Sequence, residues 1–211
     1  MREIVDLLTH AAESKMDVDF FSSIKGFLNP MEGYALCLLA ALGPGTGEAV
    51  EIGSFLGKST CYLALGCKAA DRGRVTAVDH FLGSPEHQQG MKHEERCLVQ
   101  DGSLLHQFKR NIETMGLAGH VRTMPLPSLQ AATQWSSPIR LLFIDGDHSY
   151  QASRADFEAW SPLVEENGLI VFHDIGGWEG VTRFHSECTS SGSAYRTVLA
   201  CGSIRVVERR A

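Results

Sequence analysis

Residues 50–60 read VEIGSFLGKST, an apolar run followed by two glycines and by residues that favour a helix. Glycines directly after a buried strand let the backbone approach a ligand closely, and the following helix N-terminus offers unpaired N–H donors. A P-loop needs four residues between its glycines, whereas Gly53 and Gly57 enclose three. A dinucleotide fingerprint needs a glycine where Phe55 stands. The stretch therefore predicts a ligand loop of another kind.

Two acidic residues accompany this loop. Glu51 stands two residues before Gly53 and suits a ligand with a cationic amino group, because a nearby carboxylate would repel a phosphate. Asp79 ends the next apolar run, where a carboxylate can accept both hydroxyls of a ribose. Together they indicate an adenosyl ligand across two neighbouring strand ends. A strand-to-helix turn without a ligand and a solvated loop aspartate are the structural alternatives.

Outside this loop, apolar runs alternate with helical stretches. The expected strands are residues 49–53, 74–79, 121–126, 139–145 and 168–174, with crossover helices at 58–70, 102–115, 129–135 and 150–164. Such alternation predicts a parallel sheet covered on both faces. After a helix near 181–190, a short turn joins the runs 195–200 and 203–209, so the last strand should be antiparallel. We therefore predict an α/β fold: a doubly wound, mostly parallel, seven-stranded Rossmann-like sheet with an antiparallel last strand.

The segment before the sheet has its own signals. Residues 30–42 read as an amphipathic helix, which the breakers at 43–45 end. This helix could cover the active site or contact a second copy in a homodimer. We expect a single domain, with residues 1–45 as an N-terminal helical segment and 46–211 as the ligand-binding core. The polar stretch 81–103 has no clear period and should be a functional or mobile loop.

Composition narrows the partners. The 211 residues carry a formal net charge of −6 and their Lys and Arg residues are scattered, so we expect no nucleic acid partner. No run is long enough to span a bilayer, and the N-terminus lacks the apolar stretch of a signal peptide. We therefore expect a cytoplasmic protein without a membrane partner. The six cysteines form no C-x-x-C pair and are expected to be reduced thiols.

Four segments carry a resemblance to a known family: EIGSFLGKST (51–60), TAVDHFLGS (76–84), FIDGDHSYQASRADFEAW (143–160) and GLIVFHDIGGW (168–178). Over about residues 32–178 the chain resembles the class I S-adenosylmethionine-dependent methyltransferases, and within them the methyltransferase-24 family. The resemblance implies S-adenosylmethionine as cofactor. It places Glu51, Gly53 and Ser54 around the methionine part, with Ser59 capping the next helix. The other cofactor contacts expected are Phe55, Asp79 at the ribose, His80, Ser128 at the adenine and Asp145.

Ser128 has an equally simple alternative role as an ordinary helix N-cap. The strand ends carry a further polar cluster, because Asp145 ends the run 139–145 and His173-Asp174 end the run 168–174. In a doubly wound sheet these ends face one cleft. Caffeoyl-CoA- and catechol-type O-methyltransferases, which the chain resembles, bind a divalent metal there, which implies Asp145, His173 and Asp174 as metal ligands.

The kind of metal depends on the histidine. Carboxylates alone suit Mg²⁺, whereas an imidazole shifts the preference toward Mn²⁺ or another first-row ion. Without a metal, Asp145 would hold the substrate or cap the next turn, and His173 would be a buried histidine bonded to the backbone.

The same comparison points to a general base. His148 stands where coenzyme-A-ester relatives have a lysine near the reacting hydroxyl, and an imidazole titrates near neutral pH. His80 is a second candidate. The function implied is metal-assisted O-methylation of a small-molecule hydroxyl (a sugar, phenol or natural product), with His148 and Asp145 as catalytic residues. A cephalosporin-hydroxylase-like metal-dependent hydroxylase and a cofactor-binding protein without turnover are the alternatives. The next helix carries residues expected only to pack and to cap: Asp156, Phe157 and Trp160.

Overall fold

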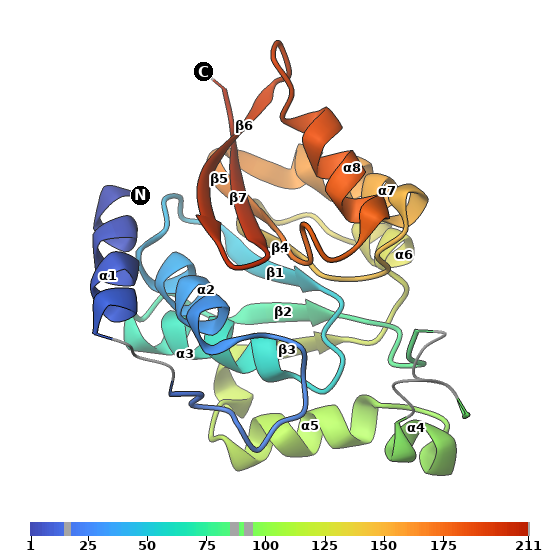
Figure 1. Ribbon diagram of the computed structural model, residues 1–211. Coiled ribbons are helices and arrows are strands. Elements are labelled where there is room, and N and C mark those ends of the chain that lie inside the picture. Colours follow the sequence, from blue (N-terminus) through green and yellow to red (C-terminus); the bar gives the residue numbers. More distant parts are fainter. Residues whose placement is uncertain (15–17, 85–88, 91–94, 211) are drawn as a thin grey trace.

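A seven-stranded sheet forms the centre of the protein, which is described by a computed structural model of residues 1–14, 18–84, 89–90 and 95–210 (Figure 1). The strands are β1 (Glu48–Ile52), β2 (Val75–Val78), β3 (Val121–Met124), β4 (Ile139–Ile144), β5 (Val164–Phe172), β6 (Tyr195–Cys201) and β7 (Ile204–Arg209). Their order in the sheet is β3-β2-β1-β4-β5-β7-β6. Strands β1 to β5 pair in parallel, whereas β7 runs antiparallel to both β5 and β6. The predicted topology is therefore confirmed.

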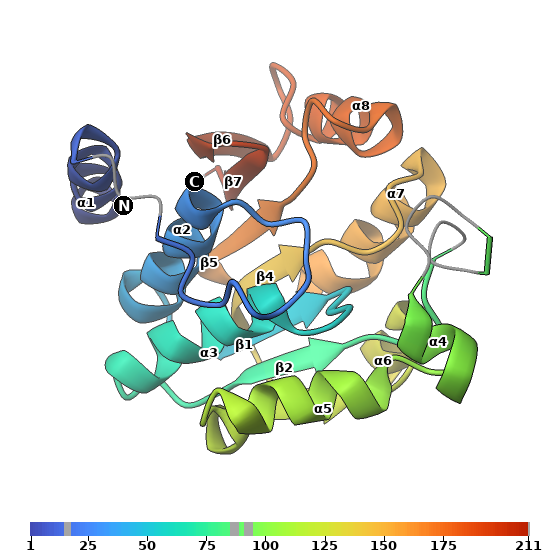
Figure 2. The ribbon, with the colours of Figure 1, turned by 60° about the horizontal axis from the view of Figure 1, so that its bottom comes forward.

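Helices cover both faces of the sheet (Figure 2). Their bounds are α1 (Arg2–Glu13), α2 (Pro30–Leu42), α3 (Lys58–Ala69), α4 (Arg96–Asp101), α5 (Leu105–Thr114), α6 (Ser128–Thr133), α7 (Tyr150–Trp160) and α8 (Glu179–Cys188), with 3₁₀ turns η2 (Ala118–His120) and η3 (Ser161–Leu163). Helices α2, α3 and α5 pack on one face, and α6, α7 and α8 pack on the other. Helix α1 lies against α2.

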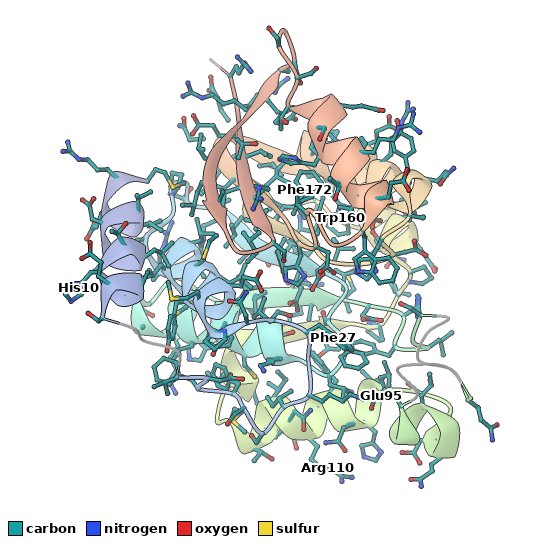
Figure 3. All side chains as sticks on the ribbon, in the orientation of Figure 1. His10, Phe27, Glu95, Arg110, Trp160 and Phe172 are labelled. Atoms are coloured by element: carbon teal, nitrogen blue, oxygen red, sulfur yellow. The ribbon has the colours of Figure 1, made fainter. Side chains whose placement is uncertain are left out.

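The side chains of strand β4 are buried by the helices on both faces of the sheet. All six of its residues are buried, and successive side chains of a strand point to opposite faces. Leu141 and Phe143 pack into the layer of α2, α3 and α5, whereas Leu142 and Ile144 pack into that of α6, α7 and α8. The second layer also holds the aromatic side chains of Trp160 in α7 and Phe172 in β5, both labelled in Figure 3. A continuous apolar run thus fits a strand that is covered twice.

Helix α2 has the predicted bounds but not the predicted amphipathic character. Its buried residues lie on all sides: Glu32, Gly33, Tyr34, Ala35, Leu36, Leu39 and Ala40. The reason is that α2 packs between α1 and α3 instead of lying on the surface. At Gly66 of α3, a Cβ atom would lie 2.2 Å from the backbone oxygen of Cys37, so the two helices approach closely only because Gly66 has no side chain.

The largest differences between predicted and observed boundaries lie at the end of α7 and the start of β5. The expected helix 150–164 ends at Trp160, because Pro162 lies in the 3₁₀ turn η3 that follows it. Strand β5 then begins at Val164, four residues earlier than expected, and its pairing with β4 shifts register between Ile139 and Leu141.

The polar stretch 81–103 is described only in part. Residues 85–88 and 91–94 lie outside the described residues, and the remainder includes the short helix α4. No helix within the described ranges is long and apolar enough to cross a membrane.

Candidate active site

A pocket of about 600 Å³ opens at the carboxyl ends of β1, β2, β4 and β5, where doubly wound sheets bind their ligands. The sequence-predicted residues that line it are Gly53, Ser54, Phe55, Ser59, Asp79, His80, Ser128, Asp145, His148, His173 and Asp174. Glu51 does not line this pocket, although the sequence places it in the same loop. The pocket thus brings together side chains from four strand ends that are far apart in the chain.

The glycine loop passes close to β4. Gly53 has φ +84°, and a Cβ at this position would lie 2.1 Å from the backbone oxygen of Asp145. Gly57, with φ +91°, is the N-cap of α3, so the cap expected of Ser59 is wrong. Ser59 is instead the second residue of the helix, and its hydroxyl helps to lower the pKa of the nearby Glu51. Glycines therefore shape both ends of the loop.

Glu51 lies beneath this loop and is fully buried. Its Oε2 accepts hydrogen bonds from the hydroxyl of Ser54 at 2.8 Å and from that of Thr60. Its Oε1 is buried and has no hydrogen-bond partner among the described residues. Burial raises the pKa of Glu51 to about 7, against the lowering effect of the surrounding hydroxyls. An unpartnered carboxylate oxygen under a glycine loop fits a ligand with a cationic amino group, such as the methionine part of S-adenosylmethionine.

Asp79 holds two loops in place. Its Oδ2 accepts from the N–H groups of Ser54 at 2.8 Å and Phe55 at 3.0 Å, and its Oδ1 accepts from the N–H of Phe81 at 2.6 Å. Phe55 and Phe81 have positive φ angles of 46° and 57°, which non-glycine residues seldom adopt. Asp79 thus stabilises these conformations, and its carboxylate retains acceptor capacity toward the pocket.

His80 is turned toward the backbone. Its Nδ1 accepts from the N–H of Leu82 at 2.9 Å, so its proton sits on Nε2. Its side chain is 47% exposed at the pocket rim. A base needs a free lone pair, and this hydrogen bond occupies the one that His80 has. The hydrogen bond with Leu82 therefore counts against His80 as a base.

Among the residues that the structure describes, Asp145, His148 and Asp174 form a group that could hold a metal ion, with ligand atoms all within 4.8 Å of one another. The Nε2 atom of His148 lies 2.9 Å from Oδ2 of Asp174. The imidazole of His148 stacks on Trp178, with ring centroids 4.7 Å apart and an interplanar angle of 15°. Asp174 itself has φ +61°, so the turn after β5 aims its carboxylate at His148.

His173, which the sequence suggested as a metal ligand, lines the pocket beside Asp145 and Asp174 but is not part of this group. It is 3% exposed, with Nδ1 2.9 Å from Oδ1 of Asp145 and Nε2 3.4 Å from Oε2 of Glu32. Each ring nitrogen faces a carboxylate, an arrangement that favours the doubly protonated imidazolium over a ring with a lone pair for a metal. Burial opposes this charge, but the neighbouring carboxylates raise the pKa of His173 to about 12. His148 takes its place in the candidate metal group.

The pKa of Asp174 is shifted in the opposite direction from that of Glu51. Burial alone would raise its pKa, but hydrogen bonds from His148 and His173 and the charges on these rings hold it well below its usual range. Asp174 is therefore ionised in the folded protein under ordinary conditions, as a metal ligand or the partner of a histidine must be.

Sequence reasoning missed some of the pocket. Asp156 of α7 was expected only to pack and cap, yet it lines the pocket at 7% exposure, and burial raises its pKa. Ala152 and Ala155 line the pocket beside it, and this spacing of small residues on one helix face was the signal available in the sequence. Phe27, from the loop before α2, and Trp178 are also part of the lining.

The alternative role of Ser128 is excluded. Pro127 is the N-cap of α6, and Ser128 is the first residue of the helix. Its Oγ accepts a hydrogen bond from the indole N–H of Trp160 at 2.9 Å. Ser128 therefore fixes the wall of the pocket that α6 and α7 share.

Comparison with known proteins agrees with this geometry. Residues 50–175 match the family model described as a methyltransferase domain, of the methyltransferase-24 family. A curated protein of Sinorhizobium fredii, the uncharacterized protein y4gI, is 27% identical over 150 residues, which are 67% of this chain. The chain spans only 14% of the length of that relative.

Solved structures share the fold. An O-methyltransferase from Bacillus cereus in complex with SAH is 21% identical, with a TM-score of 0.59 over 99% of this chain and 91% of its own. The SAH-bound methyltransferase PaMTH1 of Podospora anserina is 10% identical, with a TM-score of 0.67 over 99% and 96% of the two chains. Since the family model covers more than half of the chain, the protein belongs to the methyltransferase-24 family of class I S-adenosylmethionine-dependent methyltransferases.

Proposed function

We propose that the protein transfers a methyl group from S-adenosylmethionine to a hydroxyl of a small molecule. The observation that supports this most is one pocket that joins the glycine loop, with the unpartnered Oε1 of Glu51 below it, to the group of Asp145, His148 and Asp174. The glycine loop suits the cofactor, and the group of Asp145, His148 and Asp174 suits a substrate hydroxyl that loses its proton. Positioning of these two reactants would supply much of the catalysis.

The cofactor would lie along the ends of β1, β2 and β4. Gly53 and Ser54 would surround its methionine part, with the buried Glu51 beneath them, and Asp79 would hold the ribose. Ser128 and Asp156, which lie on the α6 and α7 side of the pocket, would face the adenine. When bound, the cofactor supplies an electrophilic methyl on a sulfonium, and a divalent ion would polarise the substrate oxygen.

Two roles of His148 compete. If its Nε2–H donates to Asp174 and the bound substrate presents its hydroxyl to Nδ1, Nδ1 takes the hydroxyl proton while the oxygen attacks the methyl, and the sulfonium becomes a neutral thioether. If a divalent ion binds to Asp145, His148 and Asp174, the ion lowers the pKa of the hydroxyl and His148 is a ligand, not a base. The overall reaction is the same in both cases. A chelator distinguishes the two roles, because full activity in excess chelator would exclude His148 as a metal ligand and leave its role as a base.

The lining of the pocket favours an acceptor without phosphate groups. Within the described part of the lining, Lys58 is the single lysine or arginine, and its ammonium pairs with Asp19 at 2.5 Å. The exposed aromatic side chains of Phe27 and Trp178 offer apolar contact instead. A neutral phenol or glycoside fits these surroundings better than a nucleotide sugar or a coenzyme A ester.

A direct test is incubation with methyl-labelled S-adenosylmethionine, Mn²⁺ and a panel of phenols, glycosides and nucleotide sugars. We expect label in a neutral acceptor and stoichiometric S-adenosylhomocysteine. Hydroxylated products that carry no label would instead establish the hydroxylase alternative. Binding of the cofactor without turnover across a broad panel would support a cofactor-binding protein.

A further inference from the structure

Glu32 is a buried carboxylate that the proposed chemistry does not use. It is the third residue of α2 and is 2% exposed. Its Oε2 accepts from the N–H of Asn29 at 3.0 Å, which closes the capping box of the helix. Its Oε1 accepts from the N–H and the hydroxyl of Ser203 at 2.6 and 2.8 Å, in the turn between β6 and β7. The side chain of Glu32 thus joins α2 to the hairpin of β6 and β7.

The same carboxylate reaches the pocket. Oε2 of Glu32 lies 3.4 Å from Nε2 of His173, and on the other side of the ring Nδ1 lies 2.9 Å from Oδ1 of Asp145 and 3.5 Å from Oδ2 of Asp174. The imidazole is 3% exposed, so water does not compete for these contacts. A continuous series of contacts therefore runs from α2 through His173 to both carboxylates of the candidate metal group.

The turn after β6 is shaped around Glu32. Gly202 has φ +57°, and a Cβ at this position would lie 2.4 Å from Oε1 of Glu32. A helix cap needs only the contact between Oε2 and Asn29. The glycine and the two bonds from Ser203 fix the other oxygen as well, so the carboxylate cannot turn away from His173.

We infer that Glu32 is a positioning residue: by holding His173, it fixes the orientation of the Asp145 and Asp174 carboxylates. This inference rests on the proposed function only in that these carboxylates bind a metal or the substrate. Groups that orient ligating side chains in this way commonly affect metal affinity or activity about 10- to 100-fold. Helix α2 would then contribute to the active site without contacting substrate.

The test compares Glu32→Gln with Asn29→Ala. Glutamine keeps the volume but removes the negative charge beside His173. Its single amide oxygen cannot replace both Oε2, which faces Asn29 and His173, and Oε1, which accepts from Ser203. Asn29→Ala removes the other half of the same box, the bond from the Glu32 N–H to Oδ1 of Asn29, and leaves the contact with His173 in place. Glu32→Asp, which keeps the charge but is one methylene shorter, serves if the glutamine variant does not fold.

Two measurements use the full chain with saturating S-adenosylhomocysteine. The first is the NMR signal of the Nδ1–H proton of His173, assigned by its loss in His173→Asn. The second is the dissociation constant of Mn²⁺ alone by calorimetry. We expect Glu32→Gln to shift the signal and to weaken Mn²⁺ binding about 10- to 100-fold, whereas Asn29→Ala changes neither.

Equal behaviour of the two variants would overturn the inference, because Glu32 would then be only a helix cap. If the unmodified protein does not bind Mn²⁺, the metal part of the proposed function fails, and the His173 signal alone decides the role of Glu32.

Discussion

At the scale of single residues, two carboxylates of the pocket region illustrate how surroundings set charge. Glu51 has only hydroxyl partners, so burial dominates and raises its pKa to about 7. Asp174 is also largely buried, but two histidines face it and its pKa falls below the usual range. Such divergence between the pKa values of acids in one region of the protein is typical of active sites. The contribution of Glu51 to the stability of the fold should therefore fall as pH rises, whereas that of Asp174 should fall as pH drops.

The raised pKa of Glu51 predicts a stability that depends on pH. The folded protein holds this proton more tightly than the unfolded chain, whose pKa is near 4.5. The resulting stabilisation is present below pH 4.5 and is lost as pH rises through about 7, for a change of about 3 kcal/mol at most. Urea unfolding without cofactor, at pH 5 and pH 8, should show this loss in the unmodified protein and not in Glu51→Gln. Parallel pH dependence of the two proteins would contradict the burial argument.

His148→Ala should slow methyl transfer about 10²–10⁴-fold while S-adenosylhomocysteine binding changes little, since His148 acts on the substrate side of the pocket. His80→Ala, measured at saturating S-adenosylmethionine because His80 lines the pocket, is the matched comparison, since the lone pair of His80 already accepts from the N–H of Leu82. Single-turnover rates with an acceptor found in the labelled panel provide the measurement. Equal rates for the unmodified protein and His148→Ala would remove His148 from the mechanism as base and as ligand.

At the scale of elements, the closeness of α2 and α3 decides where the N-terminal segment lies. Gly66→Ala would place a Cβ 2.2 Å from the backbone oxygen of Cys37, and a backbone atom cannot rotate away. We expect a loss of about 1–3 kcal/mol in the free energy of unfolding. Gly119→Ala is the control, since a Cβ at Gly119 meets nothing within 4 Å. If both variants have the stability of the unmodified protein in urea, the two helices do not pack as closely as described.

At the scale of the whole molecule, the pocket joins four strand ends, so its ligand should stabilise the entire fold. S-adenosylhomocysteine at about 100 times its dissociation constant should add about 2.7 kcal/mol, which raises the Tm by roughly 5–10 °C for a chain of this size. NAD should have no such effect, because Phe55 stands where the dinucleotide fingerprint needs glycine. Differential scanning calorimetry with each ligand checks this, and a larger shift with NAD would reverse the choice of cofactor.

Much of this organisation could be predicted from the sequence. The periodicity of apolar residues and the positions of helix-breaking residues are local properties of the sequence. The strands, the bounds of α2 and the antiparallel β7 could therefore be predicted from short stretches of chain. The glycine loop was equally local, because Gly53 and Gly57 adopt the positive φ angles that glycine permits. The position of most pocket residues at strand ends then followed from the topology of a parallel sheet.

Only the tertiary structure decided which side chains meet. The sequence suggested His173 as a metal ligand and His148 as a base, whereas the structure brings His148 into the candidate metal group with Asp145 and Asp174. His173 instead faces Glu32, which lies 141 residues before it in the chain, with its Nε2 atom. Glu51 was expected at the cofactor and lies beneath the loop, because the hydroxyls of α3 draw its carboxylate inward. Periodicity determines the face on which a residue lies, whereas the partners of a buried charge are set by packing between distant segments.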